Sequence, residues 1–250
     1  MTRRRFYASS KAFTGNNLVA LGADESQHLR NVLRLKTGDE VYVFDGLGRE
    51  FRGEIAHLKR FETDIHINEE VAPVAAESPL QLTMAVALLK GEKFDLVIQK
   101  LTELGVNSVV PTMTKRADVR LRNDEDGERK LIRWRRIVME ATKQCGRAHL
   151  MNIASPITFD ELVNRPPAEG ERLMFAERDG AHLRMVFPDK MTTPQVTAVV
   201  GSEGGWTDDE LDQARDAGWQ IITLGGRIMR AETAAITCAA LLQHQFGDLN

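Results

Sequence analysis

The segment Val196–Gln243 reads VTAVVGSEGGWTDDELDQARDAGWQIITLGGRIMRAETAAITCAALLQ. It contains two glycine-bearing loops, Gly201–Trp206 and Leu224–Arg230, and each follows an apolar run typical of a buried strand and leads into a predicted helix. Glycine lets the backbone approach a ligand closely, because it has no Cβ. Either loop alone fits an ordinary tight turn. Two such loops in one segment, the second carrying Arg227, Arg230 and Glu232, indicate a binding site.

The first loop, GSEGGW, differs from the common nucleotide-binding motifs. It lacks the Lys-Ser/Thr pair of a P-loop and does not fit G-x-G-x-x-G. Thr207 and Glu210 form a capping-box pattern for the next helix, and Asp208 and Asp209 fall in its first turn. Because these acids occupy the end of the helix that attracts anions, the pattern disfavours a phosphate ligand and favours a neutral or cationic one.

The N-terminal residues predict a small β domain. Glu40–Phe44 and Glu50–Leu58 alternate apolar and polar residues around a D-G-L-G turn, which is typical of a hairpin. Phe61–Ile67 predicts another strand, and Ser26–Leu35 has apolar residues at helical spacing. We therefore expect a β-barrel that carries one helix.

A linker and an α/β domain are predicted to follow. Residues 71–79 contain two prolines and no periodicity, which is typical of a linker. Beyond it, predicted strands alternate with predicted helices: Leu80–Leu89, Glu92–Leu104, Asn107–Met113, Glu128–Gln144 and Arg172–Glu177. This alternation implies a parallel sheet with helices on both faces. We place the domains at residues 1–72 and 73–250.

Composition argues against a membrane-spanning, a secreted or a metal-binding protein. The chain is 42% hydrophobic, has no apolar run as long as a membrane span, and begins MTRRRFYASSKAF, without the apolar stretch of a signal peptide. Its two cysteines, Cys145 and Cys238, and its six histidines show no metal-ligand spacing. We expect a reduced, cytoplasmic protein with neither a membrane nor a metal as partner.

The net charge of −3 does not exclude an RNA partner, because a polyanion responds to local patches within about 8–10 Å. Basic residues cluster in four places: Arg3–Arg5; Arg30, Arg34 and Lys36; Lys115, Arg116, Arg120 and Arg122; and Arg129–Arg136. The last run also fits a solvated helix face, since acidic residues precede it.

Seven motifs resemble one family over nearly the whole chain. GSEGGW, LGGRIMRAETA and WRRIVMEATKQCGR are similar to motifs of the small-subunit methyltransferase E family, bacterial 16S rRNA uridine-N3 methyltransferases of the SPOUT superfamily. FYASS, SQHLRNVLRLKTGDEV, KGEKFDLVIQKLTELGV and PTMTKRADVR also occur in the family's order. Ser202 and Gly226 stand where the family usually has proline, and both changes loosen the loops.

The resemblance implies a fold, a reaction and partners. The fold would be a SPOUT α/β domain with a parallel sheet and a C-terminal trefoil knot near residues 196–232, plus an N-terminal PUA-like domain. General topology rules alone would not predict a knot. The reaction would be methylation of N3 of one uridine in the 16S rRNA of the small ribosomal subunit, with S-adenosylmethionine (SAM) as cofactor. The family also implies a homodimer with active sites at the subunit interface.

The two loops are the expected cofactor site, because backbone N–H and C=O groups can bind an adenine edge. The expected cofactor-binding residues are Phe175, Gly201, Glu203, Gly204, Gly205, Leu224, Gly225, Gly226, Arg227, Ile228 and Met229. Glu203 fits contact with a cation or a ribose hydroxyl, and it also fits a cap for the following helix.

Arg230 and Glu232 are the catalytic candidates. Uridine N3 must lose a proton before it attacks, and a nearby guanidinium favours the resulting anion. Arg230 fits that role, although it also fits a structural pair with Glu232. Glu232 is a candidate general base or an anchor for Arg230, and the sequence does not decide between them.

The expected RNA contacts are mainly arginines from several clusters: Arg3, Arg4, Arg30, Arg34, Arg116, Gln144 and Arg147. On the N-terminal helix, Leu29, Val32 and Leu33 should face inward and leave a basic outer face. Gln144 and Arg147 match a Q-x-x-R motif of the family, but an arginine there also fits the end of a helix. Trp134 and Trp206 suit either base stacking or a buried core.

Two other functions stay open at this point. A non-catalytic RNA-binding or ribosome-assembly factor could have the same fold. Ser202 and Gly226 are consistent with this alternative, because they replace the prolines that make the loops rigid in the family. A methyltransferase that modifies another position, such as a tRNA ribose 2′-oxygen, is disfavoured by the full-length resemblance.

Overall fold

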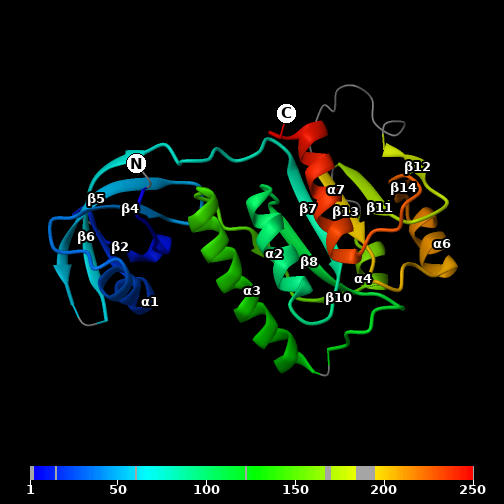
Figure 1. The fold of residues 1–250 in the computed structure, drawn as a ribbon, viewed down its shortest axis with the longest axis horizontal. Helices are drawn as coiled ribbons and strands as arrows, with labels where there is room; N and C mark the ends of the chain where they lie inside the picture. The colour runs from blue at the N-terminus through cyan, green and yellow to red at the C-terminus, as the bar shows by residue number, and fades with distance from the viewer. Residues whose placement is uncertain are drawn as a thin grey trace. The chain divides into compact units, whose positions relative to one another are not determined.

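The protein divides into two compact units (Figure 1). The computed structural model describes residues 3–14, 16–59, 61–121, 123–166, 170–183 and 195–249. The first unit comprises Met1–Glu77 together with Met139–Leu150, and the second comprises Ser78–Val138 and Met151–Asn250. The predicted boundary at residues 72 and 73 did not anticipate that a later segment groups with the N-terminal unit.

The first unit is built on a six-stranded sheet that is antiparallel except for one pair. Its strands run in the order β1 (Arg5–Tyr7), β4 (Glu40–Phe44), β5 (Glu50–Leu58), β6 (Thr63–Val71), β3 (Leu18–Leu21) and β2 (Phe13–Thr14). The predicted hairpin of β4 and β5 is confirmed. Alternate residues of these strands, such as Val41, Val43 and Ile55, are buried in one apolar core.

The predicted helix over Ser26–Leu35 is partly wrong. An α-helix, α1, covers Ala23–Gln27 and continues as one π-helical turn, η2 (His28–Val32). A π-turn has more residues per turn than an α-helix, so residues at α-helical spacing no longer share a face. Leu29 is buried as expected, whereas Val32 and Leu33 are exposed.

Buried polar contacts hold Met139–Leu150 in the first unit. The Arg5 guanidinium pairs with Glu50 at 2.9 Å and donates to the carbonyl oxygens of Thr142, Lys143 and Arg147. These carbonyls lie at the end of α3 (Asp124–Cys145), where helix geometry leaves carbonyl groups without partners. Arg5 therefore caps α3, which begins in the second unit and ends in the first.

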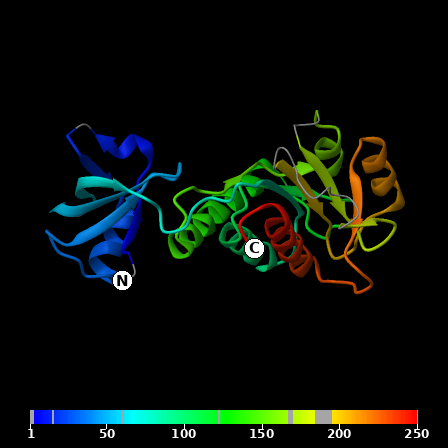
Figure 2. The same ribbon diagram turned by 90° about the horizontal axis from the view of Figure 1, so that it is seen from above.

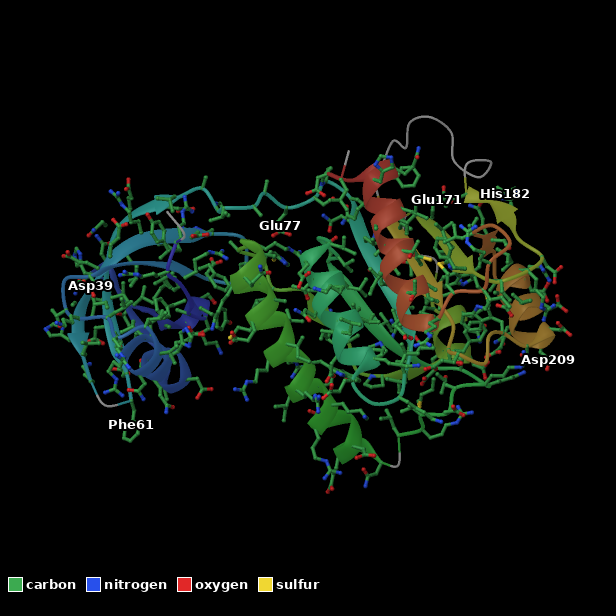
Figure 3. All side chains as sticks on the ribbon, viewed as in Figure 1. Asp39, Phe61, Glu77, Glu171, His182 and Asp209 are labelled. Atoms are coloured by element: carbon green, nitrogen blue, oxygen red, sulfur yellow. The ribbon has the colours of Figure 1, made fainter. Side chains whose placement is uncertain are left out.

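The second unit contains an eight-stranded sheet in which every pair is parallel, as the alternation predicts. The strand order is β10 (Ile157–Thr158), β8 (Ser108–Met113), β7 (Gln81–Ala87), β13 (Gln195–Val200), β11 (Glu171–Phe175), β14 (Gln220–Thr223) and β12 (Ala181–His182), with β9 (Asn152–Ile153) also beside β8. Figure 3 labels Glu171 on β11 and His182 on β12.

Helices cover both faces of this sheet (Figure 2). On one face, α2 (Lys93–Glu103) packs against α7 (Ala231–Phe246), and on the other α4 (Phe159–Val163) packs against α6 (Asp208–Asp216). The Trp206 ring lies 5.1 Å from the Phe159 ring in the core beneath α4 and α6. Trp134 is buried against Phe94. Both tryptophans therefore belong to the core.

None of the helices in the described part of the chain combines the length and apolar character needed to cross a bilayer.

Candidate cofactor and RNA site

The strand order brings the two glycine loops together. β11 lies between β13 and β14, and all three strands are parallel. The carboxyl ends of parallel strands meet at one edge of a sheet, which is where ligands bind in open α/β folds. The first loop leaves β13 and the second leaves β14, so they flank the end of β11. A cavity of about 230 Å³ lies between them.

Nearly all of the predicted cofactor residues line this cavity. They are Phe175, Gly201, Glu203, Gly204, Gly205, Leu224, Gly225, Arg227, Ile228 and Met229. Gly226 belongs to the second loop but is absent from the lining. Ala231, Ala234 and Cys238 of α7 form an apolar wall, and burial raises the pKa of the Cys238 thiol, so it is neutral.

Close packing explains the glycines of the first loop. The Gly205 N–H donates to the Ser202 carbonyl at 3.0 Å and closes a turn. A Cβ on Gly204 would lie 2.8 Å from both the Cβ and the carbonyl oxygen of Arg116. Gly205 has φ +65°, and a Cβ there would meet a Glu177 carboxylate oxygen at 2.7 Å. Larger residues would push the loop off its neighbours.

The second loop needs glycine for a different reason. Gly225 has φ +66°, a conformation that glycine adopts without strain, yet no atom lies near where its Cβ would be. Gly226 has neither a positive φ nor a close neighbour. Ile228 at the tip lines the cavity and is exposed.

The interpretation of Glu203 as a helix cap is wrong. Thr207 caps α6, and Glu210 completes the predicted capping box. The Glu210 carboxylate is fully buried and also accepts from the Lys115 N–H at 2.8 Å, while Asp209, labelled in Figure 3, pairs with the Lys115 ammonium at 3.0 Å. Acidic side chains therefore occupy the anion-attracting end of α6.

Glu203 is instead held by Lys93, which the sequence analysis did not single out. The Lys93 ammonium donates to Glu203 Oε1 at 2.7 Å and lies 3.7 Å from Glu232 Oε2. Burial raises the pKa of Glu203, but hydrogen bonds from Lys93 and from its own backbone outweigh burial and lower it below the ordinary value. Lys93 lies in the KGEKF motif and is the first residue of α2, and only that motif could have drawn attention to it.

The cavity is electrostatically mixed. Glu177 and Glu203 supply carboxylates, and Arg227 is the basic residue among those that line it. Glu177 was also missed in the sequence analysis. Carboxylates beside an apolar wall suit a ligand that carries a cation or hydroxyl groups. In the described part of the chain, no cluster of three or more histidine, cysteine or acidic side chains could hold a metal ion.

The two catalytic candidates stand at the start of α7. Arg230 is the N-terminal cap residue, is exposed, and forms no ion pair within the described residues, so the expected alternative of a pair with Glu232 is not found. Glu232 faces Lys93 and is absent from the cavity lining. Glu232 therefore pairs with Lys93 and does not anchor Arg230 in this structure.

The predicted RNA contacts differ in accessibility. Arg4, Arg34, Arg116 and Gln144 are exposed. Arg3 is half-buried and pairs with Glu50 at 3.1 Å; Arg30 is half-buried too. The Arg116 guanidinium donates to the Gly204 carbonyl at 3.3 Å, which ties it to the first loop.

Arg147 does not fit an RNA contact. The residue is 3% exposed, and its guanidinium pairs with Glu77 at 2.6 Å. Breaking a buried ion pair is costly, because it leaves an uncompensated charge. The alternative of a structural arginine near a helix end therefore describes Arg147, and we leave it out of the RNA surface.

Ser202 leaves a polar atom unsatisfied beside the cavity. The residue is 7% exposed, and its Oγ has no hydrogen-bond partner among the described residues. Burying a hydroxyl without a partner is unfavourable, so Ser202→Ala should raise the free energy of unfolding by about 1 kcal/mol, measured by urea denaturation without ligand.

Ser26→Ala is the matched control for that measurement. Ser26 is also buried, but its Oγ donates to the Leu21 carbonyl at 3.1 Å, so its loss should destabilise the protein. Equal destabilisation by both variants would show that the Ser202 hydroxyl is satisfied.

The family models that the chain matches define its class, an RNA methyltransferase domain joined to a PUA domain. Residues 76–243 match the model of the RNA methyltransferase domain family, and residues 21–65 match the RNA methyltransferase PUA domain. Ribosomal RNA small subunit methyltransferase E of Synechocystis is 34% identical over 89% of this chain and 71% of its own length. The chain belongs to this methyltransferase E family.

Two solved structures agree with that assignment. A proposed methyltransferase of Legionella pneumophila, in complex with the bound cofactor SAM, has a TM-score of 0.90 at 31% identity and covers 100% of both chains. Ribosomal RNA small subunit methyltransferase E of Neisseria gonorrhoeae, bound to SAM, has a TM-score of 0.87 at 30% identity over 99% of this chain and 100% of its own.

Proposed function

We propose that this protein transfers the methyl group of SAM to N3 of one uridine in the 16S rRNA of the small ribosomal subunit. The observation that carries the proposal is the cavity between the two glycine loops, in a chain that belongs to the methyltransferase E family. The nature of the cavity supports SAM as cofactor, since an apolar wall, loop backbone and two carboxylates suit an adenine, ribose hydroxyls and a sulfonium cation.

The chain's own residues would bind the cofactor and stabilise the negative charge that develops on the uridine. When bound, SAM supplies an electrophilic methyl group. The backbone of both loops would hold the adenine, and Glu203 and Glu177 would accept hydrogen bonds from hydroxyl groups or offset the positive charge. Arg230 would favour the deprotonated uridine, whose negative charge spreads to the carbonyl oxygens beside N3. We assign no general base, because Glu232 faces Lys93.

The same proposal includes a knotted backbone, a homodimer, a cytoplasmic location and separate roles for the two domains. The loops would form a trefoil knot, and two copies of the chain would pair with active sites at their interface. A ribosomal substrate implies a cytoplasmic protein. We also propose domain roles, with residues 1–72 binding RNA and residues 73–250 carrying the methyl transfer.

Two measurements test the proposed function. Calorimetry should detect saturable binding of SAM, and mapping of the modified base should find N3-methyluridine missing from the 16S rRNA of a deletion strain. Assembled small subunits should be better substrates than naked rRNA. Protein that binds rRNA but not SAM would support the alternative of a non-catalytic assembly factor. Binding of SAM with methylation of another RNA position would change only the substrate.

Exposed arginines of the first unit should supply RNA affinity without affecting the cofactor. Arg4 and Arg34 are exposed and form no ion pairs within the described residues, so both suit phosphate contacts. Arg4→Ala plus Arg34→Ala should weaken binding to 16S rRNA. The slope of log K against log salt should become shallower by about 0.7–0.9 for each phosphate that is no longer neutralised.

Lys59→Ala is the control for that variant. Lys59 is exposed in the same unit but already pairs with Glu62 and Asp64, each at 2.9 Å, so its removal should change the salt slope little. Full RNA affinity in the double variant would assign the first unit a scaffolding role.

A further inference from the structure

We propose that Lys93 is a positioning residue for the methyl transfer. Its ammonium group would hold the first glycine loop and the start of α7 in the arrangement that binds both the cofactor and the target base. This inference rests on the proposed function and adds to it a residue outside the two loops.

The evidence is a bridge between three elements that are distant in sequence. Lys93 is the first residue of α2, Glu203 belongs to the first loop, and Glu232 lies in the first turn of α7. The ammonium lies 2.7 Å from the Glu203 carboxylate and 3.7 Å from that of Glu232. The hydrogen bond to Glu203 raises the pKa of Lys93, so the bridge keeps its positive charge.

This bridge differs from an ordinary surface ion pair. Exposed pairs usually contribute little, because water screens them. The Glu232 side chain, however, is only 14% exposed, and its Oε2 is buried with no hydrogen bond from a described residue. Without the Lys93 ammonium, two carboxylates would share the site with no cation between them. The Glu203 carboxylate would lose its hydrogen bond and the buried Glu232 carboxylate its cation, so the first loop and the start of α7 would no longer be held together.

Both halves of the proposed site would be affected by such a separation. Glu203 lines the cofactor cavity, so its movement would change the shape of the first loop. Glu232 follows Arg230 by two positions, and Arg230 caps the same helix. The positive charge of Arg230 lowers the pKa of Lys93, although the hydrogen bond from Lys93 to Glu203 outweighs this effect. Movement of the first turn of α7 would therefore displace the guanidinium that stabilises the uridine anion.

The test compares two lysines of α2 with equal exposure. The Lys93 and Lys100 side chains are each 37% exposed, but the one ion pair that Lys100 makes within the described residues is with Glu103, three positions along the same helix. Methionine keeps the apolar stem and removes the charge. We expect Lys93→Met to raise the Kd for SAM about tenfold and to lower kcat at saturating SAM. A tenfold change lies within the range of interaction energies between residues of one salt-bridge network. Lys100→Met should change neither.

A conservative variant and a stability measurement separate positioning from folding. Lys93→Arg keeps the charge and should restore most of the affinity and turnover. Without ligand, Lys93→Met should melt at a somewhat lower temperature than Lys100→Met, because it leaves the Glu232 carboxylate without its cation, so Kd and kcat are compared at a temperature at which both variants are folded. In a double-mutant cycle, the losses of SAM affinity caused by Glu203→Gln and by Lys93→Met should not be additive, because the two side chains are in direct contact.

The possible failures are distinguishable. If the wild-type protein shows no saturable SAM binding, both the proposed function and this inference are contradicted. If the wild-type protein binds SAM and Lys93→Met binds it equally well with normal kcat, only the inference is overturned. A lower melting temperature with unchanged Kd and kcat would show a purely structural bridge, and would overturn it too.

Discussion

Arg230→Ala should bind SAM almost normally and lose nearly all turnover. Arg230 is exposed at the start of α7, is absent from the cavity lining and has no ion pair within the described residues, so its charge is available to the substrate. Loss of one group that stabilises developing charge typically costs about 3–4 kcal/mol, or roughly 100–1,000-fold in rate. Single-turnover methylation of small subunits and calorimetry with SAM would measure the two effects separately.

Arg227→Ala provides the comparison within the same loop. Arg227 lines the cavity, so its loss should weaken SAM binding more than it lowers the rate at saturating SAM. Near-normal turnover of Arg230→Ala would remove Arg230 from the mechanism. A large loss of SAM affinity in that variant would instead move Arg230 to the cofactor site.

Gly204→Val is expected to prevent SAM binding. A Cβ at this position would lie 2.8 Å from the Arg116 backbone oxygen and Cβ, so the first loop would have to move away from its neighbour. A β-branched side chain makes this conflict worse. Gly225→Val should have a similar effect through the second loop, because φ +66° is strained for valine. Calorimetry with SAM and circular dichroism would separate lost binding from lost folding.

Gly226→Ala is the matched control for the loop variants. Gly226 has no positive φ, and no atom lies within 4 Å of the point where a Cβ would stand, so alanine should be tolerated there. If Gly204→Val and Gly225→Val also bind SAM normally, the two loops are ordinary turns and the site lies elsewhere.

Much of the fold could be predicted because its signals are local. Polar and apolar residues alternate in Glu40–Phe44 and Glu50–Leu58, which is the period of a strand. After the linker, segments with the period of a strand alternate with segments that have the period of a helix. The same reasoning failed at Ser26–Leu35, where one π-turn rotates Val32 and Leu33 to the surface. A helical period read from the sequence assumes an unbroken α-helix.

The candidate site was predictable to the extent that backbone conformation defines it. Gly204, Gly205 and Gly225 lie where close packing or a positive φ requires glycine, and the pattern of the two loops points to them directly. Lys93 and Glu177 were missed because their roles depend on contacts with the first loop. Nothing in the residues beside them in the sequence indicates those contacts.

By itself, the sequence determined the two kinds of domain, the positions of the glycine loops, the family resemblance and the candidates Arg230 and Glu232, because each depends on residue type and short spacing. Only the tertiary structure decided which side chains meet. Placing β11 between β13 and β14 set the two loops around one cavity, and packing α2 against α7 brought Lys93 to Glu232. It also buried Arg147 against Glu77. Such pairings depend on the order in which strands and helices pack, and that order is not contained in any local pattern.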